Sequence, residues 1–379
     1  MKKLVLLWLF SLAFIAGCSD APTFAGKPDA PDETDKQILF HIHNADYAAA
    51  DSLITMRLKE KPDHPKYYFL KSSLLFHARY FYATQANRDS IKNLFGDYCR
   101  QTIRLAEKLP PTTENKFYLG SAHSYLSRVH IMNRSFTDAY FDAATGEDYL
   151  EDVIEENPEY YDAYLNLGVL QYFIATRTNW WQSGLAFLSG MSGNKEDALR
   201  QLRLVHEKGA FNKNEAGFIL TQVYQFFENS TENARVYGMW YRDNFPNNFF
   251  MERQYNMIAL TDLITQRGVQ YFESNIDSLA AKYTLTNAGP LNGVGYRLIT
   301  DNKTEDALVI FRVNMKLFPE VANCYDSYAE ANALLGRKEE AIKYYTMAYD
   351  KTLTDQSLNE EFKKTLQTGI QDKLKELRK

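Results

Sequence analysis

The segment 321–351 reads as two amphipathic helices joined by a tight turn, and this unit constrains the fold of the whole chain. In the first helix, Val321, Tyr325 and Tyr328 recur at intervals of four and three residues, which places them on one face of a 3.6-residue helix. Gly336 follows as a C-terminal stop, where a positive φ is needed. The buried face of the second helix carries small and aromatic residues, namely Ala341, Tyr345 and Ala348. Because small side chains let two helices pack closely, the unit predicts an antiparallel helix pair.

The same spacing and the same turn recur along the chain. Ala307 lies 34 residues before Ala341, and the turn at 193–198 (GNKEDA) matches the turn at 336–341 (GRKEEA). Earlier units carry corresponding large, small and proline residues: Leu291, Val294, Gly295, Leu298, Phe311, Pro319, Phe218, Ala234, Pro246, Ala198, Ala50, Ile54 and Pro62. Since each unit has an apolar face that it cannot bury alone, the units are expected to stack into a solenoid.

This pattern resembles the tetratricopeptide repeat (TPR), a 34-residue helix–turn–helix unit. The matching residues of the last unit are Tyr325, Tyr328, Ala329, Ala341, Tyr345 and Ala348. Asn332, Leu353 and Asn314 depart from the family pattern, which has a large ring, proline and alanine at those positions. The tandem 291–350 also resembles repeats at the end of some serine β-lactamase-like proteins, a likeness that implies no activity. The resemblance implies an all-α fold for residues 35–379: an α-solenoid of stacked antiparallel helix pairs, a TPR-like superhelix.

An extra segment interrupts the repeat spacing at 176–193, where a helix partner is expected. Trp181, Leu185 and Leu188 lie one turn apart in it, which predicts a short amphipathic helix. With the residues that follow, the segment resembles a bacterial TPR group related to a mitochondrial outer-membrane protein family. The residues that carry this likeness are Gly190, Gly193, Leu199, Leu202, Leu204 and Gly209.

The N-terminus has the pattern of a cleaved leader. Lys2 and Lys3 precede an apolar run at 4–15, whose 12 residues are too few for a comfortable membrane span. Residues 15–18, Ile-Ala-Gly-Cys, end the run and resemble the lipobox of bacterial lipoproteins. That resemblance implies that residues 1–17 are a lipoprotein signal peptide.

By the same resemblance, Cys18 is the lipidated residue, and several acyl chains would give stable anchoring. Ser19, which is not Asp, favours transfer to the outer membrane. The expected location is therefore the bacterial cell envelope, lipid-anchored at the outer membrane. An ordinary secretory peptide with a chance cysteine is the alternative, and periplasmic or cell-surface orientation stays open.

Residues 18–34 are rich in proline and acids without an apolar period, and we expect a disordered tether. Loss of the signal peptide removes two lysines and changes the formal charge from −5 to −7. A mildly acidic body argues against nucleic-acid binding, which needs a basic footprint. Cys99 and Cys324 lie far apart in an elongated array, which predicts two buried thiols and no disulfide between them.

The last segment, 357–379, is amphipathic. Its apolar residues step by four, four, four and three: Phe362, Leu366, Ile370, Leu374 and Leu377. The opposite face mixes lysines with acids, which favours a helix that caps the solenoid over one that binds a membrane or a partner.

No catalytic constellation assembles in the sequence. Ser192 and Lys195 have the Ser-x-x-Lys spacing of penicillin-recognising enzymes, but they fall in the repeat turn and the other motifs of that class are missing. His123 and His130 lie two helical turns apart, too distant to share a metal without another ligand between them. The sequence therefore predicts a protein that is not an enzyme, with no cofactor and no metal.

The concave surface is the remaining candidate site. By the family pattern, its partner-binding groove is expected at Tyr172, Asn292, Tyr296, Asn323, Asp326 and Glu330. The last two units have no basic residue at these positions, which argues against a clamp for a terminal carboxylate. Aromatic rings with acids would suit an extended peptide that carries Lys or Arg. Tyr296 fits groove lining or packing equally, Phe173 is expected to pack, and Asp162 also falls at a groove position.

Two functions follow from these features. The first is a membrane-anchored, non-catalytic protein–protein interaction scaffold whose partner is an envelope protein or an extended peptide segment. The second is a ligand-binding lipoprotein that delivers a peptide or carbohydrate to an outer-membrane transporter. In the second case Trp180 and Trp181 would be stacking platforms.

Overall fold

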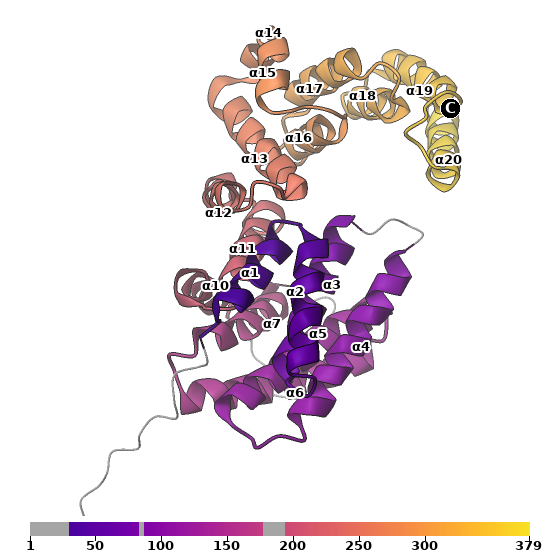
Figure 1. Ribbon diagram of the computed structural model, residues 1–379. Coiled ribbons are helices and arrows are strands. Elements are labelled where there is room, and N and C mark those ends of the chain that lie inside the picture. Colours follow the sequence, from indigo (N-terminus) through magenta and orange to yellow (C-terminus); the bar gives the residue numbers. More distant parts are fainter. Residues whose placement is uncertain (1–29, 83–86, 177–193) are drawn as a thin grey trace, which may run out of the picture.

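The structure is a computed structural model that describes residues 30–82, 87–176 and 194–379. Figure 1 shows two parts, an N-terminal group of helices (residues 33–244) and a curved C-terminal arc (residues 249–377). Within the described ranges the regular elements are helices, and no strand forms among them. The expected all-α solenoid of stacked antiparallel helix pairs is confirmed, with the closest pairing between helices adjacent in the chain.

The N-terminal group contains α1 (Glu33–His43), α2 (Tyr47–Glu60), α3 (Pro65–Tyr82), α4 (Arg88–Ala106), α5 (Thr113–Met132), α6 (Phe136–Glu156), the 3₁₀ turn η1 (Tyr161–Ala163), α7 (Tyr164–Thr176), α10 (Lys195–Lys208), α11 (Lys213–Phe226) and α12 (Thr231–Asn244). The arc contains α13 (Phe249–Arg267), α14 (Val269–Ser274), α15 (Ile276–Lys282), α16 (Gly289–Thr300), α17 (Thr304–Leu317), α18 (Ala322–Leu334), α19 (Lys338–Thr352) and α20 (Glu360–Leu377).

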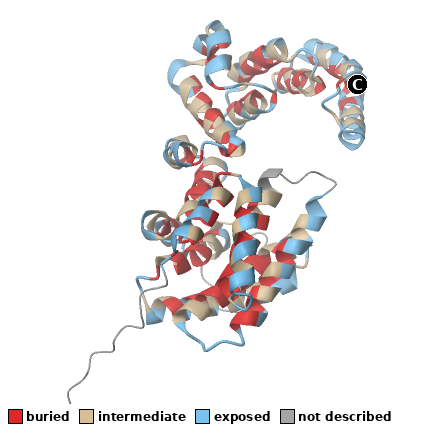
Figure 2. Cartoon of the chain, viewed as in Figure 1, coloured by how far each residue is buried: buried red, intermediate tan, exposed pale blue. Residues whose placement is uncertain are grey.

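The pair α18 and α19 packs as its spacing predicts. Ala329, Ala341 and Ala348 are fully buried in one cluster with Tyr345, so backbone approaches backbone where the side chains are short. Gly336 ends the first helix with a φ of +74°, a conformation that costs other residues more. Figure 2 shows the same arrangement along the arc, with buried residues where helices meet and exposed ones outside.

Two departures from the repeat pattern are explained by hydrogen bonds. Asn332 is buried and its Nδ2 donates to the Tyr328 carbonyl at 2.9 Å, whereas the Nδ2 of buried Asn314 donates to the Ala288 carbonyl at 3.0 Å. A buried amide is tolerated when it is bonded in this way. Leu353, at the usual proline position, lies outside the core and is 61% exposed.

The helix α6 runs through Gly146 without a break, although glycine inside a helix lowers its stability. Gly146 lies against Gly120 of α5: a Cβ placed on it would be 2.9 Å from the Gly120 carbonyl oxygen and 2.7 Å from Ser124 Oγ. The glycine is therefore needed for close approach of two helices rather than for a turn.

The first helix begins two residues before the expected boundary at 35. Asp32 is its N-cap and forms a capping box with Asp35, whose side chain accepts from the Asp32 amide. Asp35 is also paired with buried Lys66 of α3 at 3.0 Å. These contacts tie the start of α1 to α3.

The end of α1 closes the N-terminal group on itself. His43 Nδ1 lies 2.8 Å from the Tyr241 hydroxyl, and the His43 carbonyl accepts from Asn248 Nδ2 at 2.8 Å. Asn44 Oδ1 accepts from the Asn247 amide at 3.0 Å. About 200 residues separate these partners in sequence, so this part of the array is closed where the repeat pattern alone predicts an open superhelix.

The arc ends in α20, which packs against α19 and buries Ile370 and Leu374. Cys99 and Cys324 are buried free thiols as predicted, and burial raises the pKa of each to about 12. Across the part of the chain that the structure describes, we find no helix with both the length and the apolar character needed to cross a membrane.

We predict that Gly146→Ala destabilises the fold by about 1–3 kcal/mol, because the added methyl group overpacks the contact between α5 and α6. Gly369→Ala in α20 is the matched control. It meets no atom within 4 Å and should raise stability by up to about 1 kcal/mol through helix propensity. Urea unfolding followed by circular dichroism measures both, and equal effects of the two changes would contradict the close-contact argument.

Candidate functional site

The inner side of the arc carries a polar cluster on α16 and α18. The Tyr296 hydroxyl donates to Glu330 Oε2 at 2.7 Å and lies 3.3 Å from Ser327 Oγ. Its ring packs edge-on against Phe311 at 5.4 Å between ring centres. The ring of Tyr296 packs as one of the two expectations had it, and its lining of a groove stays a prediction.

Asp326 lies one turn before Glu330 on α18. Burial, together with the nearby charge of Glu330, raises the pKa of Asp326 to about 6, and Lys373 of α20 offsets only part of this effect. Burial also raises the pKa of Tyr296, helped by its hydrogen bond to Glu330. We call Tyr296, Asp326, Ser327 and Glu330 the arc cluster.

The two predicted asparagines lie on the same helices as the arc cluster. Asn292 is on α16 and Asn323 is on α18, and both are partly buried. The Oδ1 atom of Asn292 is buried and accepts no hydrogen bond from the described residues. The structure thus places five of the six predicted groove residues on α16 and α18, with Tyr172 elsewhere.

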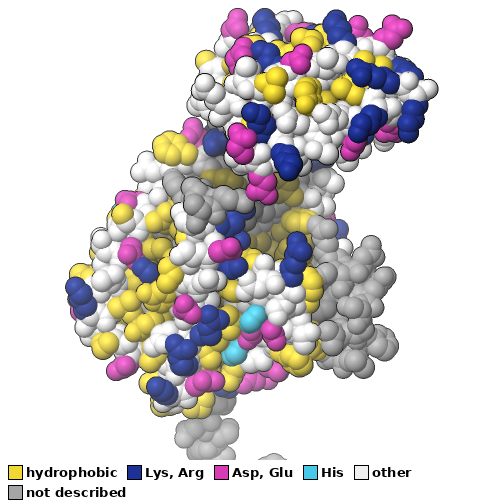
Figure 3. Space-filling view, turned by 90° about the vertical axis from the view of Figure 1, so that its right-hand side faces the viewer, with side chains coloured by type: hydrophobic (Ala, Val, Ile, Leu, Met, Phe, Trp, Pro, Cys, Tyr) yellow, Lys and Arg dark blue, Asp and Glu magenta, His cyan; other side chains and the backbone are white. Residues whose placement is uncertain are grey.

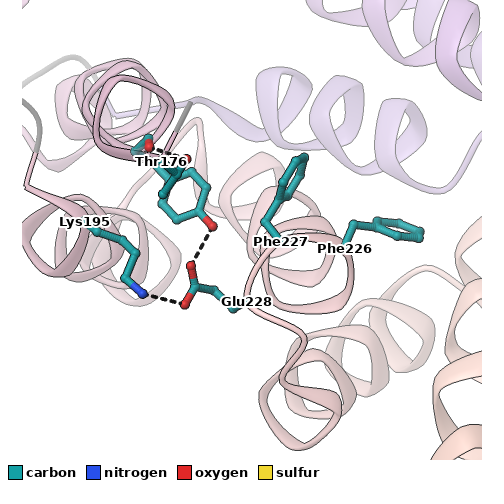
Figure 4. A pocket seen from close by; sticks show the side chains of 6 residues that line it. Thr176, Lys195, Phe226, Phe227 and Glu228 are labelled. Atoms are coloured by element: carbon teal, nitrogen blue, oxygen red, sulfur yellow. Dashed lines mark hydrogen bonds and ion pairs between the residues drawn. The ribbon is translucent and has the colours of Figure 1, made fainter. Parts of the chain in front are cut away.

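Tyr172 lies on α7 beside a cavity of about 500 Å³, which opens where α7, α10 and the α11–α12 turn meet (Figure 4). The cavity is lined by Tyr172, Thr176, Lys195, Phe226, Phe227 and Glu228, and we call it the α7–α11 cavity. The Tyr172 ring is buried, so this residue reaches the cavity by its hydroxyl rather than by an open face.

The polar wall of the cavity is a three-residue network. Glu228 Oε1 accepts from the Tyr172 hydroxyl at 2.7 Å, and Glu228 Oε2 accepts from Lys195 Nζ at 2.9 Å. Burial alone would raise the pKa of Glu228, but the hydrogen bonds from Lys195 and Tyr172 outweigh burial and lower it. The carboxylate is therefore ionised at neutral pH and neutralised by the lysine.

Two other sequence-based assignments change. Asp162, expected in the groove, is buried and its carboxylate accepts from the amides of Ala210, Phe211 and Asn212 at 2.7–3.0 Å. It therefore fixes the turn before α11. Phe173, expected to pack, does contact Phe227 edge-on at 5.8 Å, yet 38% of it stays exposed beside the cavity.

One contact joins the α11–α12 turn to α16. Arg297 donates to the Asn229 side chain at 2.6 Å and to its carbonyl at 3.2 Å. Asn229 follows Glu228, and Arg297 follows Tyr296. Sequence reasoning missed Lys195, Phe226 and Glu228. In the sequence, two adjacent phenylalanines and Asn229 mark this turn. In the structure, Asn229 has a φ of +53°.

Of the two residues that define the Ser-x-x-Lys motif, the structure describes only Lys195. Its ammonium group is bound to Glu228, and Asn194 caps α10 through its side chain. The other residues of the extra segment on which predictions rest lie outside the described residues, as does Cys18; they are Trp180, Trp181, Leu185, Leu188, Gly190, Ser192 and Gly193.

Asp142 of α6 lies between His123 and His130. His123 Nδ1 is 2.7 Å from Asp142 Oδ1, and His130 Nε2 is 3.2 Å from Asp142 Oδ2. His123 and His130 could share a metal only with another ligand between them, and Asp142 occupies that position. Even so, no set of three or more histidine, cysteine or acidic side chains suited to a metal ion occurs within residues 30–82, 87–176 and 194–379.

Charged side chains of both signs are interspersed over the face shown in Figure 3. A single-sign basic stripe, the footprint of a nucleic-acid-binding surface, does not appear on that face.

No protein-family model matches the chain, and no curated protein sequence does. Matching solved structures include yeast Tom70, with 11% identity over 92% of this chain and 89% of that chain and a TM-score of 0.29. The TPR domain of P58(IPK) has 15% identity over 92% of this chain and 98% of that chain, with a TM-score of 0.25. TM-scores this low do not establish a shared fold. The repeat fold is therefore inferred from the helices and packing described above.

We predict that Asp326→Asn raises the melting temperature by about 2–4 °C at pH 7.5 and by roughly half as much at pH 5. An aspartate with a raised pKa holds its proton more tightly in the folded chain than in the unfolded one. Its contribution to stability is therefore lost as pH rises from about 4 through about 6, and asparagine removes that loss.

Differential scanning fluorimetry at both pH values measures this effect. Asp372→Asn on α20 is the control, because Asp372 is an exposed carboxylate. A gain at pH 5 equal to that at pH 7.5 would show that ionisation of Asp326 is not the cause.

Proposed function

We propose that this chain is a non-catalytic protein–protein interaction scaffold, held in the bacterial cell envelope by lipid on Cys18. The observation that supports the scaffold most directly is the arc cluster. Asp326 and Glu330 lie one turn apart on α18. Burial and the charge of Glu330 disfavour the ionised form of the Asp326 carboxyl group, so this arrangement lowers the stability of the fold at neutral pH. An arrangement that costs stability is common at surfaces that bind a partner.

The architecture supports the same function. Helix pairs stacked in an arc offer a long inner surface made by the first helix of each pair, and such solenoids bind extended segments along it. An envelope protein or an extended peptide segment with Lys or Arg would complement the two carboxylates of the arc cluster. Such a cation would take the place of water beside Asp326 and favour its ionised form.

Anchoring through Cys18 follows from the lipobox-like residues 15–18. The first described helix starts at Glu33, so about 15 residues would join the anchor to the fold. A flexible chain of that length spans on the order of 20 Å. The tether would join the fold at the start of α1, which is tied to α3.

We predict that Glu330→Gln combined with Tyr296→Phe lowers recovery of a specific envelope partner at least tenfold. The experiment crosslinks intact host cells that express the tagged full-length chain, solubilises them in detergent and identifies the co-purified proteins. The two changes remove a charge and a hydroxyl but keep the ring that packs on Phe311.

Glu339→Gln on the outer helix α19 is the matched control, because Glu339 is exposed and the charge change is the same. It should leave recovery unchanged. Recovery that is equal in all variants would remove the arc cluster from the interface, and the absence of any stoichiometric partner would overturn the scaffold.

We also predict that Cys18→Ser moves the protein from the membrane pellet to the soluble fraction of lysed host cells. The acyl chains on Cys18 would be the attachment, and no helix of the described residues could replace them as a membrane span. Immunoblots of the two fractions measure the change. Retention of the variant in the pellet after a high-salt wash would sink the anchor assignment.

A further inference from the structure

We propose that mild acid opens the contact that closes the N-terminal group, through protonation of two neighbouring histidines, His43 and His77. His43 is the last residue of α1, and His77 lies in α3. Both side chains are buried, and their ring centres lie 4.6 Å apart. We call these two residues the histidine pair. The pair lies where the end of α1 meets α12 and the start of α13.

His43 makes contacts that bridge the two ends of the N-terminal group. Its Nδ1 lies 2.8 Å from the Tyr241 hydroxyl of α12, and its carbonyl accepts from Asn248, the N-cap of α13, at 2.8 Å. Tyr241, Phe245 and Asn248 are themselves buried. A proton added to His43 would therefore place a charge inside the contact that holds α1, α12 and the start of the arc together.

The surroundings of His77 suit a neutral ring. Its imidazole packs edge-on against Phe76, at 5.4 Å between ring centres, and against Phe218 of α11, at 5.7 Å. Burial among such side chains costs a charged group much more than a neutral one. Two imidazolium ions at the separation of the pair would also repel each other. The closed contact is therefore compatible with the neutral form of both histidines.

Titratable and charged groups face the pair from the neighbouring helices, namely Tyr47 of α2, Arg128 of α5, Glu215 of α11 and Tyr241 of α12. Glu215 would favour a proton on the pair, but it already accepts from the Tyr125 hydroxyl and, at 3.1 Å, from Arg128. Burial lowers the pKa of His77 to about 4, although Glu215 acts in the opposite direction. Burial, together with His77, lowers the pKa of His43 well below its usual value.

The direction of the pH effect follows from these shifts. In the opened form each imidazole meets water and takes up a proton with a pKa of about 6.5, whereas in the closed form His77 does so only near pH 4. The closed form is therefore fully favoured above about pH 6.5 and loses that advantage as the pH falls toward 4. The arc responds in the opposite sense, because protonation of Asp326 removes a disfavoured charge there. Acid should thus open the N-terminal contact while the arc stays folded.

Hydrogen–deuterium exchange of the full-length chain in detergent tests the inference at pH 7.5, 6 and 5, with correction for the intrinsic exchange rates. Amides at the end of α1 and at residues 241–248 report the opening. Between pH 6 and pH 5 the opening constant should rise about sevenfold for each histidine that gains a proton, hence about 50-fold for the pair. Amides of α18 and α19 in the arc should show no such rise.

Variants separate the histidine pair from other acid-sensitive groups. The double change His43→Asn with His77→Gln removes both imidazoles and keeps polar side chains, so the opening constant should be equal at pH 6 and pH 5. The single change His77→Phe keeps a ring beside Phe76 and Phe218, and it should leave the sevenfold rise that His43 alone provides. His130→Gln in α5 is the matched control, because His130 lies outside this contact, and it should keep the full rise.

Three results would overturn the inference. The first is an opening constant that does not change between pH 6 and pH 5 in the unchanged protein. The second is an equal rise in the arc, which would mean that the whole chain unfolds. The third is the full rise in the double variant, which would assign the acid sensitivity to carboxylates such as Asp35, the partner of Lys66. If the double variant is already open at pH 7.5, His77→Phe decides, and a rise of the full size in it would contradict the role of the pair.

Discussion

Close approach of helix backbones is the constraint on which this structure depends. Gly120 and Gly146 meet at the contact of α5 and α6, and Gly295 accepts the ring of Phe311, where any Cβ would lie 2.2 Å from that ring. Ala329 and Ala341 play the same part between α18 and α19. Helices held this closely stack with a fixed offset, and a fixed offset repeated along the chain produces the curved arc.

A second constraint closes the N-terminal group. The end of α1 contacts Tyr241 and Asn248 through hydrogen bonds to His43. Burial lowers the pKa of His43 well below its usual value, as does the neighbouring His77, so His43 is neutral in the fold. A neutral imidazole bonded to a buried hydroxyl fits a dry interface. These contacts hold the two ends of the N-terminal group together, and the arc continues from its last helix.

The two candidate surfaces are the α7–α11 cavity in the N-terminal group and the arc cluster on α16 and α18. In the α7–α11 cavity the charges of Lys195 and Glu228 cancel, whereas in the arc cluster Asp326 and Glu330 share one sign. The two surfaces therefore differ in net charge.

The sequence by itself determined the helices and their pairing. Spacing of Ala, Tyr and Gly over 34 residues predicts where helices begin, end and meet, because these features are local and periodic. Packing of the Tyr296 ring against Phe311 is one of the two alternatives that the sequence offers for this residue. The repeat pattern assigned Asp162 wrongly to the groove, because the sequence does not distinguish a buried carboxylate that binds the amides of a distant turn from an exposed one.

Only the tertiary structure decided which distant elements meet. The contact of His43 with Tyr241 and the position of Glu228 between Tyr172 and Lys195 join residues that lie far apart in the sequence. Nothing in a repeat pattern encodes them, because the pattern specifies contacts between neighbours, whereas these depend on the summed curvature of many units.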